Sequence, residues 1–312
     1  MTRLSNIFLI VLLVGAACTS NPSGYISETA PFAAPQDRGM VNDPQLAEVS
    51  GLVASRKNPG ALWVHNDSGH PAALSLINRR GKLMATFYLK GAEDIDWEDI
   101  AIGPGPLAGE TYLYVGDIGD NLSLRSSHCV YRVVEPIFTA TPDQTMIDTL
   151  TRIKSLRFSY PDGTPDAETL LLDPQTRRLY VLTKEMSQIR IYALDTDASQ
   201  QTAQLVATLP YDGANLLDRL VGGDVSPDGS EVLLKTYEHV LYWSRKDTIL
   251  SIPALLQLSA DTLPYYVEPQ GEAVGFAADG SGYYTLSEEN MGANIHLYFY
   301  PRLPPDSIQA AP

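Results

Sequence analysis

The sequence predicts an all-β protein, a β-propeller of five four-stranded antiparallel blades around a central channel. One unit recurs along the chain, a short apolar strand that ends in polar residues. Aligning it places equivalent positions at Trp63, Tyr114, Tyr180, Leu233 and Tyr284. Their separations of 51, 66, 53 and 51 residues are typical of propeller blades. Seventeen Tyr against seven Phe also favour half-buried strands. A six-bladed ring stays open, because residues 137–154 could contain further strands.

The remaining strands of each unit follow from the same alignment. An inner strand precedes each polar-ended strand, and a third and an outer strand follow it. We expect third strands at 73–78, 130–134, 189–194, 240–243 and 295–300, and outer strands at 84–89, 155–160, 202–209 and 263–267. The fifth unit has no outer strand after Tyr300, so the segment before Leu46 should supply it and remove an exposed edge. Residues 251–258, with Pro253 near their start, are the one expected short helix.

The first 17 residues have the pattern of a signal peptide. Arg3 precedes an apolar run, 4–14, and the small residues 15–17 follow it. Cys18 comes next and resembles the lipid-attachment site of bacterial lipoproteins, although Gly15 stands where that pattern prefers a large aliphatic residue. Thr19 in place of Asp favours outer-membrane sorting. We therefore expect an exported lipoprotein of the cell envelope, facing the periplasm or the exterior. Ordinary cleavage, which leaves Cys18 as a free N-terminal residue, is the alternative.

Composition divides the rest of the chain. Residues 18–40 are expected to form a lipid-attached linker, 41–302 the propeller and 303–312 a disordered tail. The formal charge of −15 gives no electrostatic reason to bind nucleic acid or anionic lipid headgroups, so the lipid should be the only membrane contact. We expect a monomer. Cys129, the only other cysteine, begins an apolar run and is expected to be a buried thiol.

Polar residues concentrate at the start of the first strand and at the end of the second strand of each blade, which should lie on the same face of the ring. These strands run antiparallel, so the start of the first and the end of the second emerge together beside the channel. Glu98, Glu168 and Glu272 occupy equivalent inner-strand positions. Asp96 lies two residues before Glu98, and Asp117 lies at the end of the second strand of the same blade. Crowded carboxylates repel one another, and a hard cation among them relieves that cost. Oxygen-only ligands suit Ca²⁺, so these five residues are the candidate metal ligands. The alternative is that the glutamates bond backbone N–H groups between blades.

Ligand-binding residues are expected on the same face. The candidates are Glu48, His65, Asn66, Asp67, Asp120, Asn121, Lys184, Lys235, Glu288 and Glu289. For Lys184 and Lys235, the sequence favours the alternative that their aliphatic stems cover blade edges. No Gly-x-Ser-x-Gly, His-Glu-x-x-His or phosphate-binding glycine-rich loop is present in the sequence, and we expect no organic cofactor.

Several strings resemble a group of uncharacterised bacterial exported β-propeller proteins. They are Asp-Trp-Glu-Asp-Ile-Ala at 96–101, Gly-Asp-Ile-Gly-Asp-Asn at 116–121, Tyr-Arg-Val-Val-Glu-Pro at 131–136, Gly-Gly-Asp-Val-Ser-Pro-Asp-Gly at 222–229 and Gln-Gly-Glu-Ala-Val at 270–274. The resemblance covers about residues 46–300 and implies an exported propeller, with no settled activity. Inner-strand glutamates around a channel cation are also loosely similar to calcium-dependent apyrases, gluconolactonase-type propellers and propeller phytases, at the level of fold alone.

Two functions follow as expectations. The first is a module that binds a small molecule, a glycan or a protein partner on the acidic face, with Ca²⁺ as a structural ion. The second is a metal-dependent hydrolase acting on a lactone or a phosphoester, in which Asp96 or Asp117 serves as base. The negative charge of the chain disfavours a phosphate substrate and suits a neutral lactone better.

Overall fold

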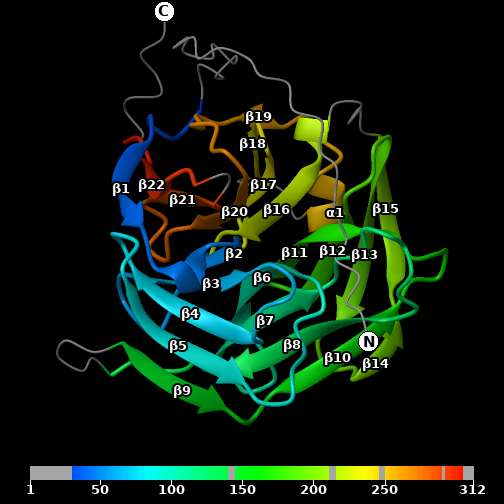
Figure 1. Ribbon diagram of the computed structural model, residues 1–312. Helices are drawn as coiled ribbons and strands as arrows, with labels where there is room; N and C mark the ends of the chain where they lie inside the picture. The colour runs from blue at the N-terminus through cyan, green and yellow to red at the C-terminus, as the bar shows by residue number, and fades with distance from the viewer. Residues whose placement is uncertain (1–29, 140–144, 211–215, 246–249, 290–291, 305–312) are drawn as a thin grey trace, which may run out of the picture.

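The computed structural model describes residues 30–139, 145–210, 216–245, 250–289 and 292–304 (Figure 1). The predicted signal peptide, Cys18, the linker up to residue 29 and the tail from residue 305 lie outside the described residues. Five sheets form a ring, which confirms the five-bladed propeller. The inner strands are β2 (Val49–Ala54), β6 (Trp97–Pro104), β11 (Ala167–Asp173), β16 (Leu220–Val225) and β20 (Gly271–Phe276). Each contacts the next around the ring, and β20 contacts β2.

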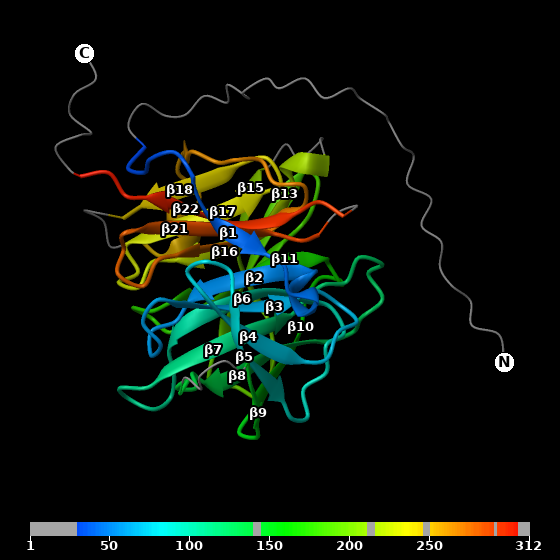
Figure 2. The ribbon, with the colours of Figure 1, turned by 60° about the vertical axis from the view of Figure 1, so that its left-hand side comes forward.

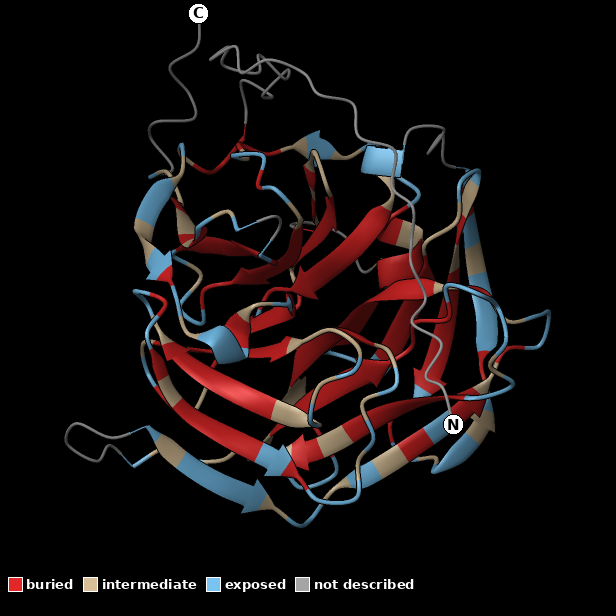
Figure 3. Ribbon diagram, in the orientation of Figure 1, coloured by how far each residue is buried: buried red, intermediate tan, exposed pale blue. Residues whose placement is uncertain are grey.

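Each blade continues outward as an antiparallel meander. The second strands are β3 (Ala61–Asn66), β7 (Thr111–Asp117), β12 (Arg178–Thr183), β17 (Glu231–Thr236) and β21 (Gly282–Ser287). The third strands are β4 (Ala73–Asn78), β8 (His128–Val134), β13 (Gln188–Asp195), β18 (Val240–Ser244) and β22 (Ile295–Pro301). The fourth strands are β5 (Leu83–Leu89), β10 (Lys154–Ser159), β15 (Gln204–Pro210), β19 (Asp261–Thr262) and β1 (Gln36–Val41). The inner strands are buried, and exposure grows toward the rim (Figure 3).

The N-terminal strand closes the ring. β1 pairs antiparallel with β22, from Val41 opposite Ile295 to Gln36 opposite Phe299, and a bridge joins Phe32 to Arg302 (Figure 2). The predicted closure by the segment before Leu46 is therefore confirmed. The predicted linker boundary at residue 40 needs correction, because residues 36–40 belong to this strand. Phe32 is 2% exposed and packs edge-on against Tyr242 and Tyr283.

Two blades gain a fifth strand from the next blade along the chain, out of the connection between its third and fourth strands. β9 (Met146–Leu150) pairs in parallel with β5, and β14 (Gln200–Thr202) pairs in parallel with β10. This corrects the expectation of four antiparallel strands in every blade. Residues 137–154 thus contain a strand, β9, but among the described residues they add no sixth blade.

Two local expectations have different outcomes. The outer strand of the fourth blade is β19 at Asp261–Thr262 and not 263–267, because Pro264 has no N–H with which to continue the ladder. The expected short helix is confirmed as α1 (Ile252–Leu255), with Pro253 in its first turn. Two 3₁₀ turns, η1 (Pro44–Leu46) and η2 (Leu216–Asp218), complete the described elements.

A five-membered ring brings its inner strands very close together. A Cβ atom at Gly275 would lie 2.6 Å from the Leu52 carbonyl oxygen, and one at Gly222 would lie 2.7 Å from that of Glu272. Backbone oxygens cannot move aside as a flexible side chain can. Glycine at these positions therefore lets neighbouring blades meet at the axis.

Candidate metal centre on the acidic face

A β-bulge marks the start of the inner strand in every blade. The register between the inner and second strands shifts across Ser50, Glu98, Glu168, Val221 and Glu272, one residue in each blade. A bulge leaves one residue out of the ladder and re-aims its side chain. The equivalent inner-strand positions found by aligning the sequence repeats are therefore the same positions that the bulges displace from the hydrogen-bonded ladder. Three of the five are glutamates.

Five carboxyl groups gather at this layer. Asp67, Asp96 and Glu98 each have a side-chain oxygen within 4.8 Å of the others, and so do Glu98, Asp166 and Glu168. Glu98 belongs to both groups and links them. Glu98 and Glu168 are only 4% and 3% exposed, whereas the three aspartates are half-buried at the mouth of the cluster. Sequence analysis placed Asp67 among the ligand-binding residues and did not propose Asp166 as a ligand.

The loop after β7 forms a close wall for this cluster. A Cβ atom at Gly119 would lie 2.1 Å from Glu98 Oε1 and 2.5 Å from Asp96 Oδ2. The Gly119 N–H donates to the Asp96 carbonyl oxygen at 3.2 Å, and the Asp120 N–H donates to Asp166 Oδ1 at 2.8 Å. The carboxyl groups are thus positioned by backbone contacts from one loop.

The cluster carries a high electrostatic cost in the absence of a cation. Burial, and then the charge of Glu168, raises the pKa of Glu98 well above its usual range. Burial likewise raises the pKa of Glu168 well above its usual range, although Lys184 opposes the shift. Burial and the charges of Asp67 and Asp166 raise the pKa of Asp96 to about 6. Each shift means that the ionised carboxylate is short of compensating positive charge.

Lys184 supplies part of that charge. Its ammonium donates to Glu168 Oε1 and, at 3.3 Å, to the Tyr237 hydroxyl oxygen. The Tyr237 hydroxyl in turn donates to Glu272 Oε1 at 2.7 Å. Glu272 is therefore joined to the cluster through Tyr237 and Lys184 and does not belong to either three-carboxyl group. The other oxygen of Glu168, Oε2, is buried and has no hydrogen-bond partner among the described residues.

Asp117, a predicted metal ligand, lies behind this cluster. Its Oδ1 atom pairs with the Arg125 guanidinium at 2.8 Å and accepts the Asp96 N–H at 3.2 Å. Asp120, a predicted ligand-binding residue, accepts the N–H groups of Leu124 and Arg125. Both aspartates therefore hold the loop after β7 in place, and neither belongs to the two groups of three carboxyl residues.

The other predicted ligand-binding residues divide between the interior and the rim. His65 is buried, with its ring edge-on to Trp97, and burial lowers its pKa to about 4. Lys235 is fully buried and donates to the Tyr265 hydroxyl and to the Gly271 carbonyl oxygen. The rest lie toward the rim or hold loops: Glu48 pairs with His70, Asn66 donates to the Gln45 carbonyl, and Asn121 and Glu289 are exposed. Glu288 is instead buried near Glu272 and accepts from Gln270, and burial and the charge of Glu272 raise its pKa to about 10.

Carboxylates do bond backbone N–H groups of neighbouring blades, as the alternative to a metal site proposed, but these carboxylates belong to aspartates and not to the glutamates at the bulges. Asp99 accepts the N–H groups of Ile100 and Leu170, and Asp224 accepts those of Val225 and Phe276. Each aspartate thereby ties its own inner strand to the next one. The glutamates at the bulges are left available to face the axis.

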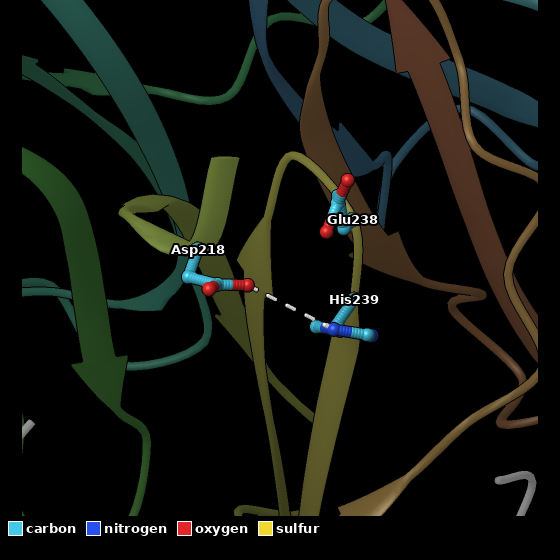
Figure 4. Close-up of side chains that lie close together, drawn as sticks. All are labelled: Asp218, Glu238 and His239. Carbon is cyan, nitrogen blue, oxygen red and sulfur yellow. Dashed lines mark ion pairs between the residues drawn. The ribbon is translucent and has the colours of Figure 1, made fainter. Parts of the chain in front are cut away.

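A pocket and a second polar group adjoin the acidic face. The pocket has a volume of about 660 Å³, and Tyr237 and Tyr266 are among its lining residues. At its edge, Asp218 on η2 approaches His239, with Oδ1 3.9 Å from Nε2, and Glu238 lies beside them (Figure 4). Sequence analysis missed both features, because the residues come from separate loops that lie apart in the sequence and share no repeated spacing.

Comparisons with known proteins add little to this geometry. No protein-family model matches the chain, and no curated protein matches it. A solved structure of a luciferin-regenerating enzyme is similar to it, with 11% sequence identity and a TM-score of 0.48 over 86% of this chain and 96% of that chain. This likeness carries no argument about activity. Among the described residues, no helix is long and apolar enough to cross a membrane.

Proposed function

We propose that this protein binds Ca²⁺ at its acidic face and uses that face to bind a ligand from solution. The proposed ion ligands are Glu98, Glu168, Asp67, Asp96 and Asp166. The observation that carries the proposal is the sharing of Glu98 by two groups of three carboxyl oxygens, each group within 4.8 Å. This placement is costly for a protein that holds no cation there.

The residues present fit Ca²⁺ in their chemistry. All five donors are oxygens, and Ca²⁺ accepts six to eight oxygen ligands at irregular angles. Glu168 Oε2 is a buried acceptor without a hydrogen-bond partner among the described residues, as expected for an oxygen reserved for an ion. Gly119 leaves the space beside Glu98 and Asp96 that any side chain would fill. No histidine or cysteine belongs to these two groups, which disfavours zinc.

Calcium titration tests the proposal directly. The melting temperature of the chelator-treated protein should rise with added Ca²⁺, and calorimetry should give saturable binding. Glu98→Gln keeps the shape of the side chain and should abolish both responses. Asp148→Asn, at an exposed position on β9, is the matched control and should leave them unchanged. Equal Ca²⁺ responses in wild type and Glu98→Gln would exclude this site.

A hydrolase is the second candidate, and one observation favours it. The Asp96 carboxyl lies in the cluster and has a pKa of about 6, close to the value suited to a general base at neutral pH. When bound, Ca²⁺ would supply charge stabilisation to a polarised oxygen of the substrate. Turnover of a lactone or phosphoester panel would support this activity if chelator abolishes it and if Asp96→Asn, which also removes a proposed ion ligand, lowers turnover by a larger factor than it lowers Ca²⁺ affinity. Calcium binding without any turnover would leave the binding function alone.

Export and lipid attachment are also proposed, from sequence alone. The support is the apolar run at 4–14, the small residues after it and the cysteine at position 18. Mass spectrometry of the mature N-terminus tests both steps. A diacylated Cys18 in the membrane fraction, and release of Cys18→Ser from that fraction, are the expected results. A mature chain with an unmodified N-terminal cysteine would support ordinary cleavage.

A further inference from the structure

The pocket beside Tyr237 has the size and lining of a small-molecule site. Its volume of about 660 Å³ lies within the range of ligand pockets in proteins. It lies between the turn after β17 and the segment that leads into β20, on the acidic face. Its lining includes two tyrosines, two glutamates, Val267 and Pro269.

The two tyrosines are held in place by their surroundings. Tyr266 is 53% exposed, and its ring is backed by Tyr298 at a centroid distance of 4.9 Å. Its backbone N–H donates to the Tyr300 hydroxyl at 3.0 Å. Tyr237 is fixed by its hydrogen bond to Glu272. Such rings offer flat apolar faces at a low entropic cost, because little motion is lost when a ligand binds.

The charge of the pocket is one-sided. Glu238 and Glu268 line it, and no lysine or arginine is among the described residues of its lining. Two lysines that contact its surroundings are already engaged: Lys184 pairs with Glu168, and Lys235 is buried in hydrogen bonds to Tyr265 and Gly271. An anionic ligand would therefore meet uncompensated negative charge. A positively charged group would gain from the carboxylates and from the electron-rich face of the exposed Tyr266 ring, whereas the Lys184 ammonium already lies over the Tyr237 ring, 5.4 Å from its centroid.

We propose that this pocket binds an organic ammonium ion, an amine or quaternary ammonium carried on a small apolar body. Tyr266 and Tyr237 would contact the apolar surface around the charged nitrogen, and Glu238 would supply the counter-charge. This inference rests on the proposed function in one respect: it specifies the class of ligand that the acidic face binds. The pocket residues themselves are separate from the five proposed Ca²⁺ ligands.

Three isosteric probes test the ligand class by charge alone. Choline, 3,3-dimethylbutan-1-ol and 3,3-dimethylbutanoate have similar shapes and carry positive, zero and negative charge near neutral pH. Calorimetry or ligand-observed NMR should show choline binding at least fivefold more tightly than the neutral alcohol and the carboxylate not binding. Equal affinity for choline and the alcohol, or no binding of choline, would overturn the proposal.

Variants assign the binding to the pocket. Tyr266→Ala and Glu238→Gln should each weaken choline binding at least fivefold without lowering the melting temperature. Tyr88→Ala, an exposed tyrosine on β5, and Asp261→Asn, an exposed aspartate on β19, are the matched controls and should bind as wild type does. Choline binding that all four variants retain would place the ligand elsewhere and overturn the assignment.

Repeating the titrations in chelator and in Ca²⁺ separates the two proposals. Choline binding that persists in chelator, in a protein that shows no Ca²⁺ response, would refute the metal centre and keep the pocket. A Ca²⁺ response without choline binding would do the reverse.

Discussion

At the scale of single residues, the β-bulges explain why the acidic face exists. Each bulge displaces one residue from the ladder at the start of an inner strand, and Glu98, Glu168 and Glu272 occupy three of the five positions. Ser50 and Val221 occupy the other two. Glu98 and Glu168 belong to the neighbouring second and third blades, where Asp67, Asp96 and Asp166 join them, whereas Glu272 belongs to the fifth blade.

Glu98→Gln should have opposite effects in the two states of the protein. Without Ca²⁺, folding near neutral pH must protonate Glu98, which is ionised in the unfolded chain, whereas the amide needs no proton, so the melting temperature should rise by about 2–4 °C, for roughly 1 kcal/mol of relief. With Ca²⁺, the variant lacks a ligand and should melt below wild type. Differential scanning calorimetry in chelator and in millimolar Ca²⁺ measures both. A variant that is destabilised equally in both conditions would argue for a structural role.

Gly119→Ala tests the space at the cluster. The added methyl group would lie 2.1 Å from Glu98 Oε1, so the carboxylate or the loop must move. We expect Ca²⁺ affinity to fall at least tenfold while the circular dichroism spectrum of the strands is retained. Calorimetric titration gives the affinity, and unchanged affinity would show that the cluster can rearrange without consequence.

Part of this site could be predicted from residue spacing and part could not. The aligned glutamates identified the bulge layer, because the same strand position recurs in each blade. The spacing could not show that Asp117 pairs with Arg125, since a loop residue eight positions later decides that contact. The pocket was missed for a similar reason: Tyr237 and Tyr266 lie in separate loops whose proximity only the closed ring creates.

At the scale of elements, β1 is the strand that completes the ring. It covers the edge of β22 and thereby pairs a strand that would otherwise offer its backbone to other chains. The pattern predicted this closure because the fifth unit lacked an outer strand. It did not predict β9 and β14, which are short and half-exposed and pair with the preceding blade and not with their sequence neighbours. A short polar strand shows too little hydrophobic periodicity to be recognised in the sequence. A strand that pairs in parallel with another blade is also not joined to its partner by a hairpin turn, so no Gly, Asn or Pro turn residues mark the pairing.

Truncation tests the closing strand. A chain that begins at Asn42 loses β1 and the buried Phe32, whose loss alone should cost about 3–5 kcal/mol. We expect a melting temperature at least 10 °C lower, and self-association through the uncovered edge of β22. A chain that begins at Ala30 keeps both features and is the control. Calorimetry and size-exclusion chromatography measure the two effects, and equal stability of the two chains would contradict the role given to β1.

At the scale of the whole molecule, buried acids set an unusual pH dependence. Burial raises the pKa of Asp224 and Glu268 to about 7 and that of Glu288 to about 10, and Glu98 and Glu168 titrate well above their usual range. Near neutral pH these groups bind protons in the folded protein that they release on unfolding. Stability must then fall as pH rises.

The window for this effect lies between about pH 6.5 and pH 8. Burial lowers the pKa of His65 and His128 to about 4, so they oppose the trend only below pH 6.5, and Lys235, lowered to about 8, opposes it only above pH 8. We expect the melting temperature in chelator to fall by several degrees across this window. Millimolar Ca²⁺ should reduce the fall, because it stabilises the ionised forms of Glu98 and Glu168. A flat or rising profile in chelator would contradict the account of the buried acids.

The bridge between Phe32 and Arg302 has a consequence for orientation. It brings both ends of the described chain together beside the Gly280 turn, which joins the first two strands of the fifth blade. That turn lies at the end of the blade opposite to the bulge at Glu272. The described chain therefore enters and leaves the ring at the end opposite the carboxylates, so neither of its described ends covers the acidic face.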